Sequence, residues 1–170
     1  MAEFELIERY FSALTPGSSG VRLGIGDDAA ILETPSNRQL VMTLDTLVGG
    51  RHFFCDTDPA NLGHKALAVN LSDLAAMGAE PVWALLSLTL PEADEGWLSA
   101  FAEGFRQLAL RHGVSLVGGD TCRGPLSISV QLTGLVTPGQ ALLRRGARPG
   151  DRIFVTGPLG DAALALKRLQ

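Results

Sequence analysis

Apolar residues recur along this chain at two different periods, and the two periods predict a mixture of helices and strands. Helical spacing predicts helices over residues 3–14, between Asp58 and Gly78, and between Asp94 and Gly113. Short apolar or alternating runs predict strands over residues 21–25, 29–32, 39–44, 82–90, 114–117 and 126–133. Residues 34–37 have hairpin-loop composition, residues 15–20 are expected to form a flexible loop, and Gly134 suggests a bulge or bend. A further strand over residues 152–157 and a helix over residues 161–170 complete the pattern.

The helix that follows Asp58 is the stretch around which the other candidate residues are arranged. Its side chains are apolar nearly all round, apart from Asn70 and Asp73, so the helix is expected to be buried. An unpaired buried carboxylate would cost several kcal/mol. Asp73 is therefore either neutralised by protonation, by a basic neighbour or as a cap, or it lies at the wall of a cavity that holds a cation.

Four further aspartates, Asp27, Asp28, Asp45 and Asp120, lie where the predicted strands would end and the chain would turn. Carboxylates on several strand ends, without matching Cys or His clusters, suit a hard cation such as Mg²⁺ rather than Zn²⁺. Crowded aspartates repel one another, and divalent ions together with a polyphosphate would hold them in place. We therefore expect these carboxylates to converge in space.

Composition narrows the class of protein. The 170 residues are 46% hydrophobic and 19% charged, as in a soluble globular domain rather than a disordered chain. The net charge of −4 argues against a nucleic-acid surface. No apolar run approaches the length of a membrane span, the N-terminus lacks the basic start of a signal peptide, and the two cysteines lack Cys-x-x-Cys spacing. We expect a cytoplasmic protein with no membrane or nucleic-acid partner and with free thiols.

Phosphate chemistry would have to proceed here without a P-loop, because the Gly-x-x-x-x-Gly-Lys-Ser/Thr motif is absent. Metal ions held by aspartates can bridge phosphate oxygens and neutralise the charge that moves in phosphoryl transfer. Gly119 would allow a phosphate or a metal-bound water to approach the backbone, although a simple turn is the alternative. The basic cluster at residues 144–148 is either a solvated surface or an anion contact.

Four motifs, in this order, closely resemble the thiamine-monophosphate kinase family. They are Gly24-Ile-Gly-Asp-Asp28, Asp45-Thr-Leu-Val with His52-Phe, the long run from Lys65 to Pro81, and Gly118-Gly-Asp-Thr121. The wider superfamily includes aminoimidazole ribonucleotide synthetase, selenophosphate synthetase and a hydrogenase-maturation protein. The resemblance implies a direct transfer of the γ-phosphoryl group of ATP to thiamine monophosphate, which gives thiamine diphosphate.

The resemblance also implies roles for individual positions. His52 matches a substrate-contacting position. Leu44 stands where the family frequently has Ser or Thr, so any ligand atom there must be its carbonyl oxygen. The positions that match magnesium ligands are Asp28, Thr43, Leu44, Asp45, Asp73 and Asp120, and those that match nucleotide contacts are Gly119, Asp120 and Arg144.

The family fold implies an α+β domain with a mixed, mainly antiparallel sheet and helices packed on one face. Its sheet would pair with that of a second subunit into a barrel-like dimer core. We expect residues 1–148 to form this ATP- and metal-binding domain and residues 149–170 to begin a truncated C-terminal domain. The chain by itself is then expected to dimerise, to bind nucleotide weakly if at all, and to lack kinase activity.

Two other interpretations remain open on these residues. The chain could belong to another ATP-dependent enzyme of the superfamily that acts on a different acceptor. It could also be a dimerisation module whose acidic residues no longer bind a metal.

Overall fold

The computed structural model describes residues 3–14, 20–155 and 157–169, so the predicted loop at residues 15–20 lies outside the described residues except for Gly20. The N-terminal elements are α1 (Glu3–Tyr10), the 3₁₀ helix η1 (Ser12–Leu14), β1 (Val21–Leu23) and β2 (Ile31–Leu32). The central elements are β3 (Gln39–Val48), α2 (Pro59–Ala76), β4 (Glu80–Leu90), α3 (Glu95–His112), β5 (Ser115–Arg123) and β6 (Ser127–Val136). The 3₁₀ helix η2 (Arg144–Gly146) and α4 (Asp161–Leu169) follow.

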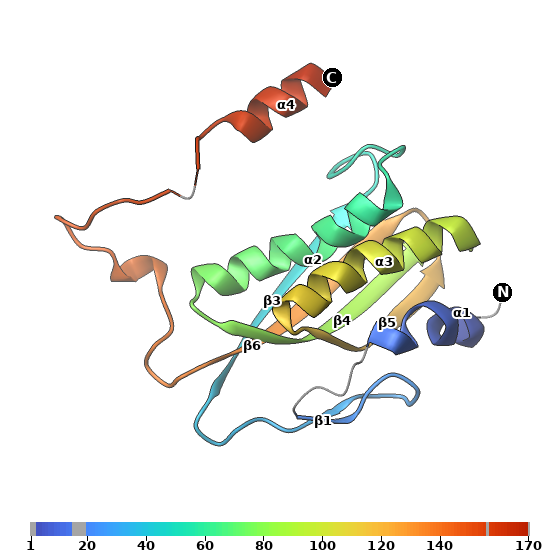
Figure 1. Cartoon of the computed structure of the whole chain (residues 1–170), viewed down its shortest axis with the longest axis horizontal. Coiled ribbons are helices and arrows are strands. Elements are labelled where there is room, and N and C mark those ends of the chain that lie inside the picture. The colour runs from blue at the N-terminus through green and yellow to red at the C-terminus, as the bar shows by residue number, and fades with distance from the viewer. Residues whose placement is uncertain (1–2, 15–19, 156, 170) are drawn as a thin grey trace.

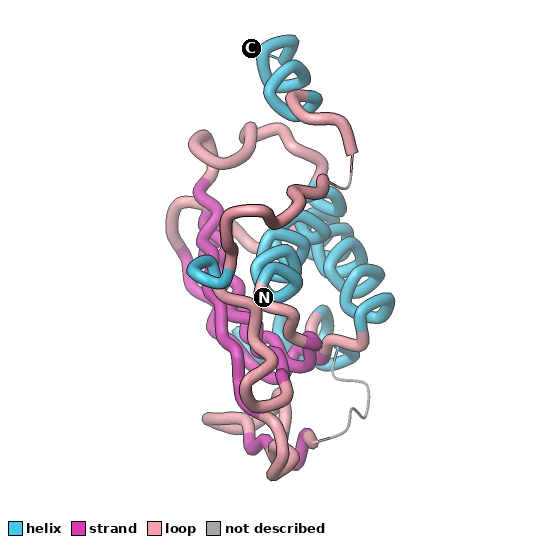
Figure 2. Tube along the Cα trace, turned by 90° about the vertical axis from the view of Figure 1, so that its left-hand side faces the viewer, coloured by secondary structure: helices cyan, strands magenta, loops and turns pink. Residues whose placement is uncertain are grey.

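Four strands form one sheet in the order β3-β6-β4-β5. β6 pairs antiparallel with both β3 and β4, whereas β4 and β5, which α3 connects, run parallel. Figures 1 and 2 show α2 and α3 side by side on one face of this sheet, so the domain has a helix layer and a strand layer. The prediction of an α+β fold with a mixed, mainly antiparallel sheet and helices on one face is confirmed.

The helix layer is held at close range by two glycines. A Cβ on Gly63 of α2 would lie 2.1 Å from the carbonyl oxygen of Phe101, and one on Gly104 of α3 would lie 1.9 Å from that of Ala60. No side chain fits at either point, so the two backbones meet there directly. Around this crossing, Leu67, Phe101, Phe105 and their neighbours are completely buried and form the core with the inner face of the sheet.

Both helices begin and end where the sequence predicted. The Asp58 side chain accepts the Asn61 N–H at 2.9 Å at the start of α2, and the Asp94 side chain accepts the Trp97 N–H at 2.7 Å at the start of α3. Gly78 and Gly113 follow the two helices with φ of 67° and 65°. These left-handed conformations end each helix as expected.

The prediction that α2 is buried all round is wrong. The helix buries one face, which consists of Leu62, Gly63, Ala66, Leu67, Asn70 and Leu74. Its other face is exposed, and Asp73 lies on it. The many alanines of the helix are small enough to lie at the surface at little cost, so its composition did not reveal which side faces the core.

Several strand predictions also need correction. β3 runs on through Asp45, and β5 runs on through Asp120, so neither aspartate ends a strand. The expected hairpin across residues 34–37 does not form, because β2 pairs with β1 and β3 pairs with β6. Residues 152–155 are not a strand, although α4 forms as predicted. The irregularity expected at Gly134 lies in β4, where the register shifts between Pro81 and Trp83 opposite Gly134 and Thr133.

The sheet face opposite the helices, here called the open face, is partly apolar. Leu40, Met42 and Leu44 point outward from β3 with exposed fractions of 51%, 64% and 63%, and Leu85 of β4 is 40% exposed. The β1–β2 hairpin lies below one end of the sheet in Figure 1, and the segment from η2 to α4 extends away from the domain. Within the described part of the chain, no helix combines the length and apolar character needed to cross a membrane.

Candidate functional site

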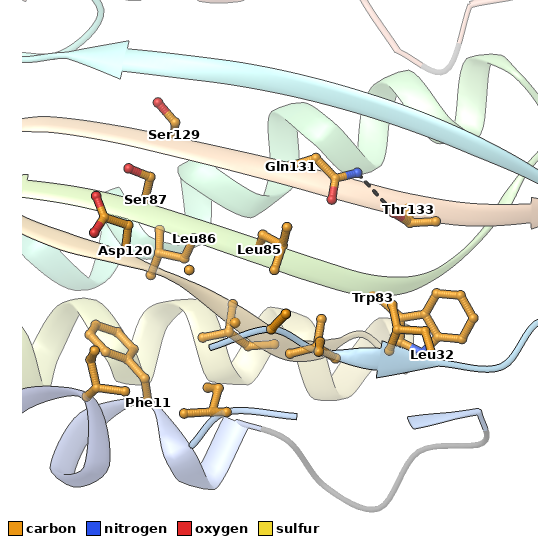
Figure 3. Close-up of a pocket in the computed structure, with 18 of the residues that line it drawn as sticks. Phe11, Leu32, Trp83, Leu85, Leu86, Ser87, Asp120, Ser129, Gln131 and Thr133 are labelled. Atoms are coloured by element: carbon orange, nitrogen blue, oxygen red, sulfur yellow. Dashed lines mark hydrogen bonds between the residues drawn. The ribbon is translucent and has the colours of Figure 1, made fainter. Parts of the chain in front are cut away.

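A cavity of about 990 Å³ lies between the open face and the N-terminal segment. Figure 3 shows side chains of the sheet, together with Phe11, which follows α1, around this cavity. Its wall combines apolar side chains, among them Phe11, Trp83 and Leu116, with carboxylates and hydroxyls. The polar lining residues are Asp27, Asp28, Thr34, Ser87, Asp120, Thr121, Ser129, Gln131 and Thr133.

Asp120 is the first of four polar side chains that form a row across the open face. The sheet register aligns Asp120 of β5 with Ser87 of β4, Ser87 with Ser129 of β6, and Ser129 with Thr46 of β3. Figure 3 shows Asp120, Ser87 and Ser129 on the same side of the sheet, and the hydroxyls of Ser129 and Thr46 lie 2.7 Å apart. The row therefore offers a carboxylate and three hydroxyls to one ligand or to its hydrating water.

Gly119, next to Asp120, is required by the sheet itself. A Cβ at this position would lie 1.9 Å from the carbonyl oxygen of Leu86 and would force β5 away from β4. Gly119 therefore allows β5 to lie close to β4, and this close pairing positions the next residue, Asp120, at the cavity. The simple turn considered for this position is wrong, because Gly119 lies within β5.

Asp27 and Asp28 face the cavity from the N-terminal side. Both are exposed, and the Asp28 N–H donates to Asp27 Oδ1 at 2.8 Å. The ion pairs within the described residues involve neither of them, nor Asp45, Asp73 or Asp120. These carboxylates are therefore available to a cation.

Asp45, Thr43 and Asp73 lie on the other side of the sheet. Thr43 and Asp45 alternate along β3 with Leu44, whose side chain lines the cavity, so they point toward the helix layer. The Thr43 hydroxyl donates to Asp73 Oδ2 of α2 at 2.9 Å. This bond joins the edge strand to the exposed face of the helix, so that Asp73 stands beside β3.

His52 lies in the tight turn between β3 and α2. The Val48 N–H donates to its Nδ1 at 3.0 Å, and Lys65 Nζ donates to its carbonyl oxygen at 2.6 Å. The imidazole is exposed, whereas the next residue, Phe53, is buried and anchors the turn in the core. Arg144 is exposed in η2 and does not line the cavity, so the structure does not bring it to the other candidates.

The expected convergence of the aspartates is only partial. Asp28 and Asp120 share the cavity on the open face, while Asp45 and Asp73 lie at the β3 edge toward the helices. In residues 3–14, 20–155 and 157–169, no three His, Cys, Asp or Glu side chains gather closely enough to hold a metal by themselves. The donors nevertheless fit Mg²⁺, which is usually bound by one or two carboxylates together with substrate phosphates and water.

Sequence reasoning missed three hydroxyls of the row, those of Thr46, Ser87 and Ser129. The alternation of Ser127, Ser129 and Gln131 in β6 was a visible signal, because it predicted one polar face for that strand. The pairing of β6 with both β3 and β4, which places the hydroxyls in one line, is a long-range feature that the pattern does not contain.

Comparison with known proteins identifies the family. Residues 26–136 match the model of the AIR synthase related protein family, N-terminal domain. The chain belongs to this family. Its matched region contains β3, the His52 turn, α2 and β5, and therefore every candidate residue except Arg144.

Individual relatives agree with this assignment. The chain is 53% identical to a thiamine-monophosphate kinase of Escherichia coli (strain K12) over 168 residues, covering 99% of this chain and 52% of that protein. The crystal structure of thiamine-monophosphate kinase from Stenotrophomonas maltophilia K279a superposes with a TM-score of 0.88 and 55% identity, covering 99% of this chain and 53% of that one. The similarity that the four motifs indicated is confirmed.

A solved complex extends the comparison to ligands. The structure of AaThiL complexed with AMPPCP and TMP superposes with a TM-score of 0.74 and 37% identity, covering 81% of this chain and 44% of that one. The chain thus spans about half the length of the curated relatives that it matches.

Proposed function

We propose that the natural protein containing this chain transfers the γ-phosphoryl group of ATP to thiamine monophosphate, in the cytoplasm and with Mg²⁺, to give thiamine diphosphate. The observation that carries this proposal is the 53% identity to a thiamine-monophosphate kinase over nearly the whole chain. The complex of AaThiL with AMPPCP and TMP supports an ATP-like and a thiamine monophosphate ligand. The carboxylate-lined cavity supplies the chemistry that such a reaction needs.

The proposed roles are those that the family resemblance implies. Asp28 and Asp120 would hold Mg²⁺ on the cavity side, and the Leu44 carbonyl oxygen and the Thr43 hydroxyl are further proposed ligands. Asp73, fixed by the Thr43 hydroxyl, and Asp45 would hold a separate Mg²⁺ at the β3 edge, on the other face of the sheet. When bound, the metal neutralises charge on the phosphate oxygens. Gly119, Asp120 and Arg144 are proposed ATP contacts, and His52 a contact to thiamine monophosphate.

The residues of the chain need only bind and align the two phosphates. A phosphate-ester acceptor is largely anionic near neutral pH, so it needs no strong general base. Phosphoryl transfer depends mainly on alignment and electrostatic stabilisation. A cavity lined by carboxylates that form no ion pair within the described residues is consistent with such a direct transfer.

The activity is tested on the longest natural polypeptide that contains residues 1–170. Incubation with ATP, Mg²⁺ and thiamine monophosphate is expected to give thiamine diphosphate and ADP in equal amounts, measured by chromatography of the thiochrome derivatives. A matched reaction without Mg²⁺ serves as the control. ADP formation only with another phosphate acceptor would assign the chain to a different enzyme of the superfamily.

We further propose that residues 1–148 form the ATP- and metal-binding domain and that residues 149–170 begin a second one. The exposure of Ile153, Phe154 and Leu159, at 95%, 84% and 83%, supports this boundary, since such side chains usually pack against something. The 170-residue chain alone is then expected to show no turnover in the same assay. Measurable thiamine diphosphate formation by the 170-residue chain would contradict this division.

The open face is proposed to pair with that of a second copy into a barrel-like homodimer core. Its exposed apolar side chains on β3 and β4 support this arrangement. Met42→Lys would place a charge in that interface at a cost of several kcal/mol. We expect analytical ultracentrifugation to show a dimer for the unchanged chain and a monomer for this variant.

Leu110→Lys is the matched control for the dimer, because Leu110 is 52% exposed on α3, in the helix layer. It is expected to leave the sedimentation coefficient unchanged. A monomeric unchanged chain, or a dimer that survives Met42→Lys, would exclude the open face as the interface.

A further inference from the structure

The turn that carries His52 fixes almost every polar group of that residue. The His52 N–H donates to the Val48 carbonyl at 3.0 Å, and the Val48 N–H donates to Nδ1 of the imidazole at 3.0 Å. The carbonyl oxygen of His52 accepts from Lys65 Nζ at 2.6 Å. Among the polar atoms of His52, only Nε2 has no partner within the described residues.

These bonds define the protonation of the ring. Because Nδ1 accepts a hydrogen bond, the proton of the neutral imidazole lies on Nε2. The exposed edge of His52 is therefore a hydrogen-bond donor. A donor in this position suits an acceptor atom on a ligand, such as a phosphate oxygen.

Lys65 links this turn to α2. The turn begins with Gly49 and Gly50, which are conformationally permissive, and Gly50 has a φ of 72°. Lys65, by contrast, extends from the second turn of α2, between Leu62 and Ala66, which are each 1% exposed. Its ammonium group therefore reaches the turn from a helix that packing holds in place.

We propose that Lys65 is a positioning residue for substrate binding: its bond to the His52 carbonyl holds the imidazole with Nε2–H directed outward to meet the substrate. The proposal rests on the proposed kinase function for the identity of the substrate. Without the lysine, Phe53 still anchors the turn, but the carbonyl of His52 loses a charge-assisted bond and the ring is no longer held against the Val48 N–H. The imidazole then samples other orientations and both tautomers.

The direct test is the imidazole ¹⁵N spectrum of His52 in the 170-residue chain, assigned through a His52→Gln variant. The unchanged chain is expected to show the pattern of the Nε2–H tautomer. Lys65→Met is expected to move both ring nitrogens toward the averaged values of a mobile imidazole. Lys65→Arg keeps a charged donor on a long side chain and is expected to restore part of the unchanged pattern.

Lys167→Met is the matched control, because Lys167 lies on the exposed helix α4 and the change is chemically identical. It is expected to leave the His52 signals in place. A His52 spectrum that Lys65→Met does not alter, or that Lys167→Met alters equally, would overturn the positioning role.

The kinetic test uses the longest natural polypeptide with the same variants. Lys65→Met is expected to raise KM for thiamine monophosphate about tenfold, as loss of one charge-assisted hydrogen bond would. KM for ATP should stay within about twofold, since His52 is not a proposed ATP contact. An equal rise in both KM values would overturn the role.

The two measurements separate failure of this inference from failure of the proposed function. If the unchanged protein makes no thiamine diphosphate, the kinase assignment fails, while the spectrum still decides whether Lys65 orients His52. If the protein is active and Lys65→Met changes neither the spectrum nor KM for thiamine monophosphate, the inference alone fails.

Discussion

Replacing Asp73 by Asn is expected to lower kcat/KM for thiamine diphosphate formation about a thousandfold, similar to the loss of a main electrostatic group in other enzymes. The Asn side-chain oxygen can still accept the Thr43 hydroxyl bond, so the joint between β3 and α2 remains. The side chain is exposed, and no change in the free energy of unfolding beyond about 0.5 kcal/mol is expected. The variant therefore removes a negative charge and little else.

Initial rates at several Mg²⁺ concentrations measure this effect, and thermal unfolding of the same samples verifies the fold. Asp56→Asn is the control, because Asp56 is exposed and the substitution is identical. It is expected to retain activity within about twofold. Full activity of the Asp73→Asn variant would remove Asp73 from the set of metal ligands and leave the Thr43 bond as its role.

The largest expected effect on stability comes from Gly104→Ala. The added Cβ would lie 1.9 Å from the Ala60 carbonyl oxygen, which is backbone and cannot rotate away. α2 and α3 must then separate, which opens the core around Phe101 and Phe105. We expect a loss of at least about 3 kcal/mol in the free energy of unfolding and a Tm lower by roughly 6–12 °C.

Gly96→Ala is the matched control, since Gly96 is exposed near the start of the same helix and its Cβ would meet only the tip of the Asp94 side chain, at 3.3 Å. That variant is expected to keep or slightly raise Tm, because alanine favours helix. Calorimetry of both variants makes the comparison. A Gly104→Ala protein as stable as the unchanged chain would mean that the helices do not cross as closely as described.

The helix ends could be predicted from the sequence because their signals are local. Asp58, Asp94, Gly78 and Gly113 act within one turn of the helix that each begins or ends. The ends of β3 and β5 could not be predicted in this way. β5 continues through Gly119 and Asp120 because β4 lies alongside to bond with it, and that partner is far away in the sequence.

The same limit explains what was missed at the candidate site. Asp45 and Asp120 were expected to converge in space, yet they lie on opposite faces of the sheet, because successive side chains along a strand point in opposite directions. The acidic residues themselves followed from the motifs, whereas their lack of ion pairs in the described residues is known only from the structure. The hydroxyl row required knowledge of the pairing of β6 on both of its sides.

The pairing of β3 with β6 has a consequence for how the protein is made. Thr46 and Ser129, whose hydroxyls meet, are separated by 83 residues of chain. Contacts at such separation form late, since the entropy of closing the loop precedes any gain from pairing. During synthesis, β3 leaves the ribosome well before its partner β6. Its apolar side chains Leu40, Met42 and Leu44 therefore remain exposed on an unpaired strand, which can associate with other nascent chains.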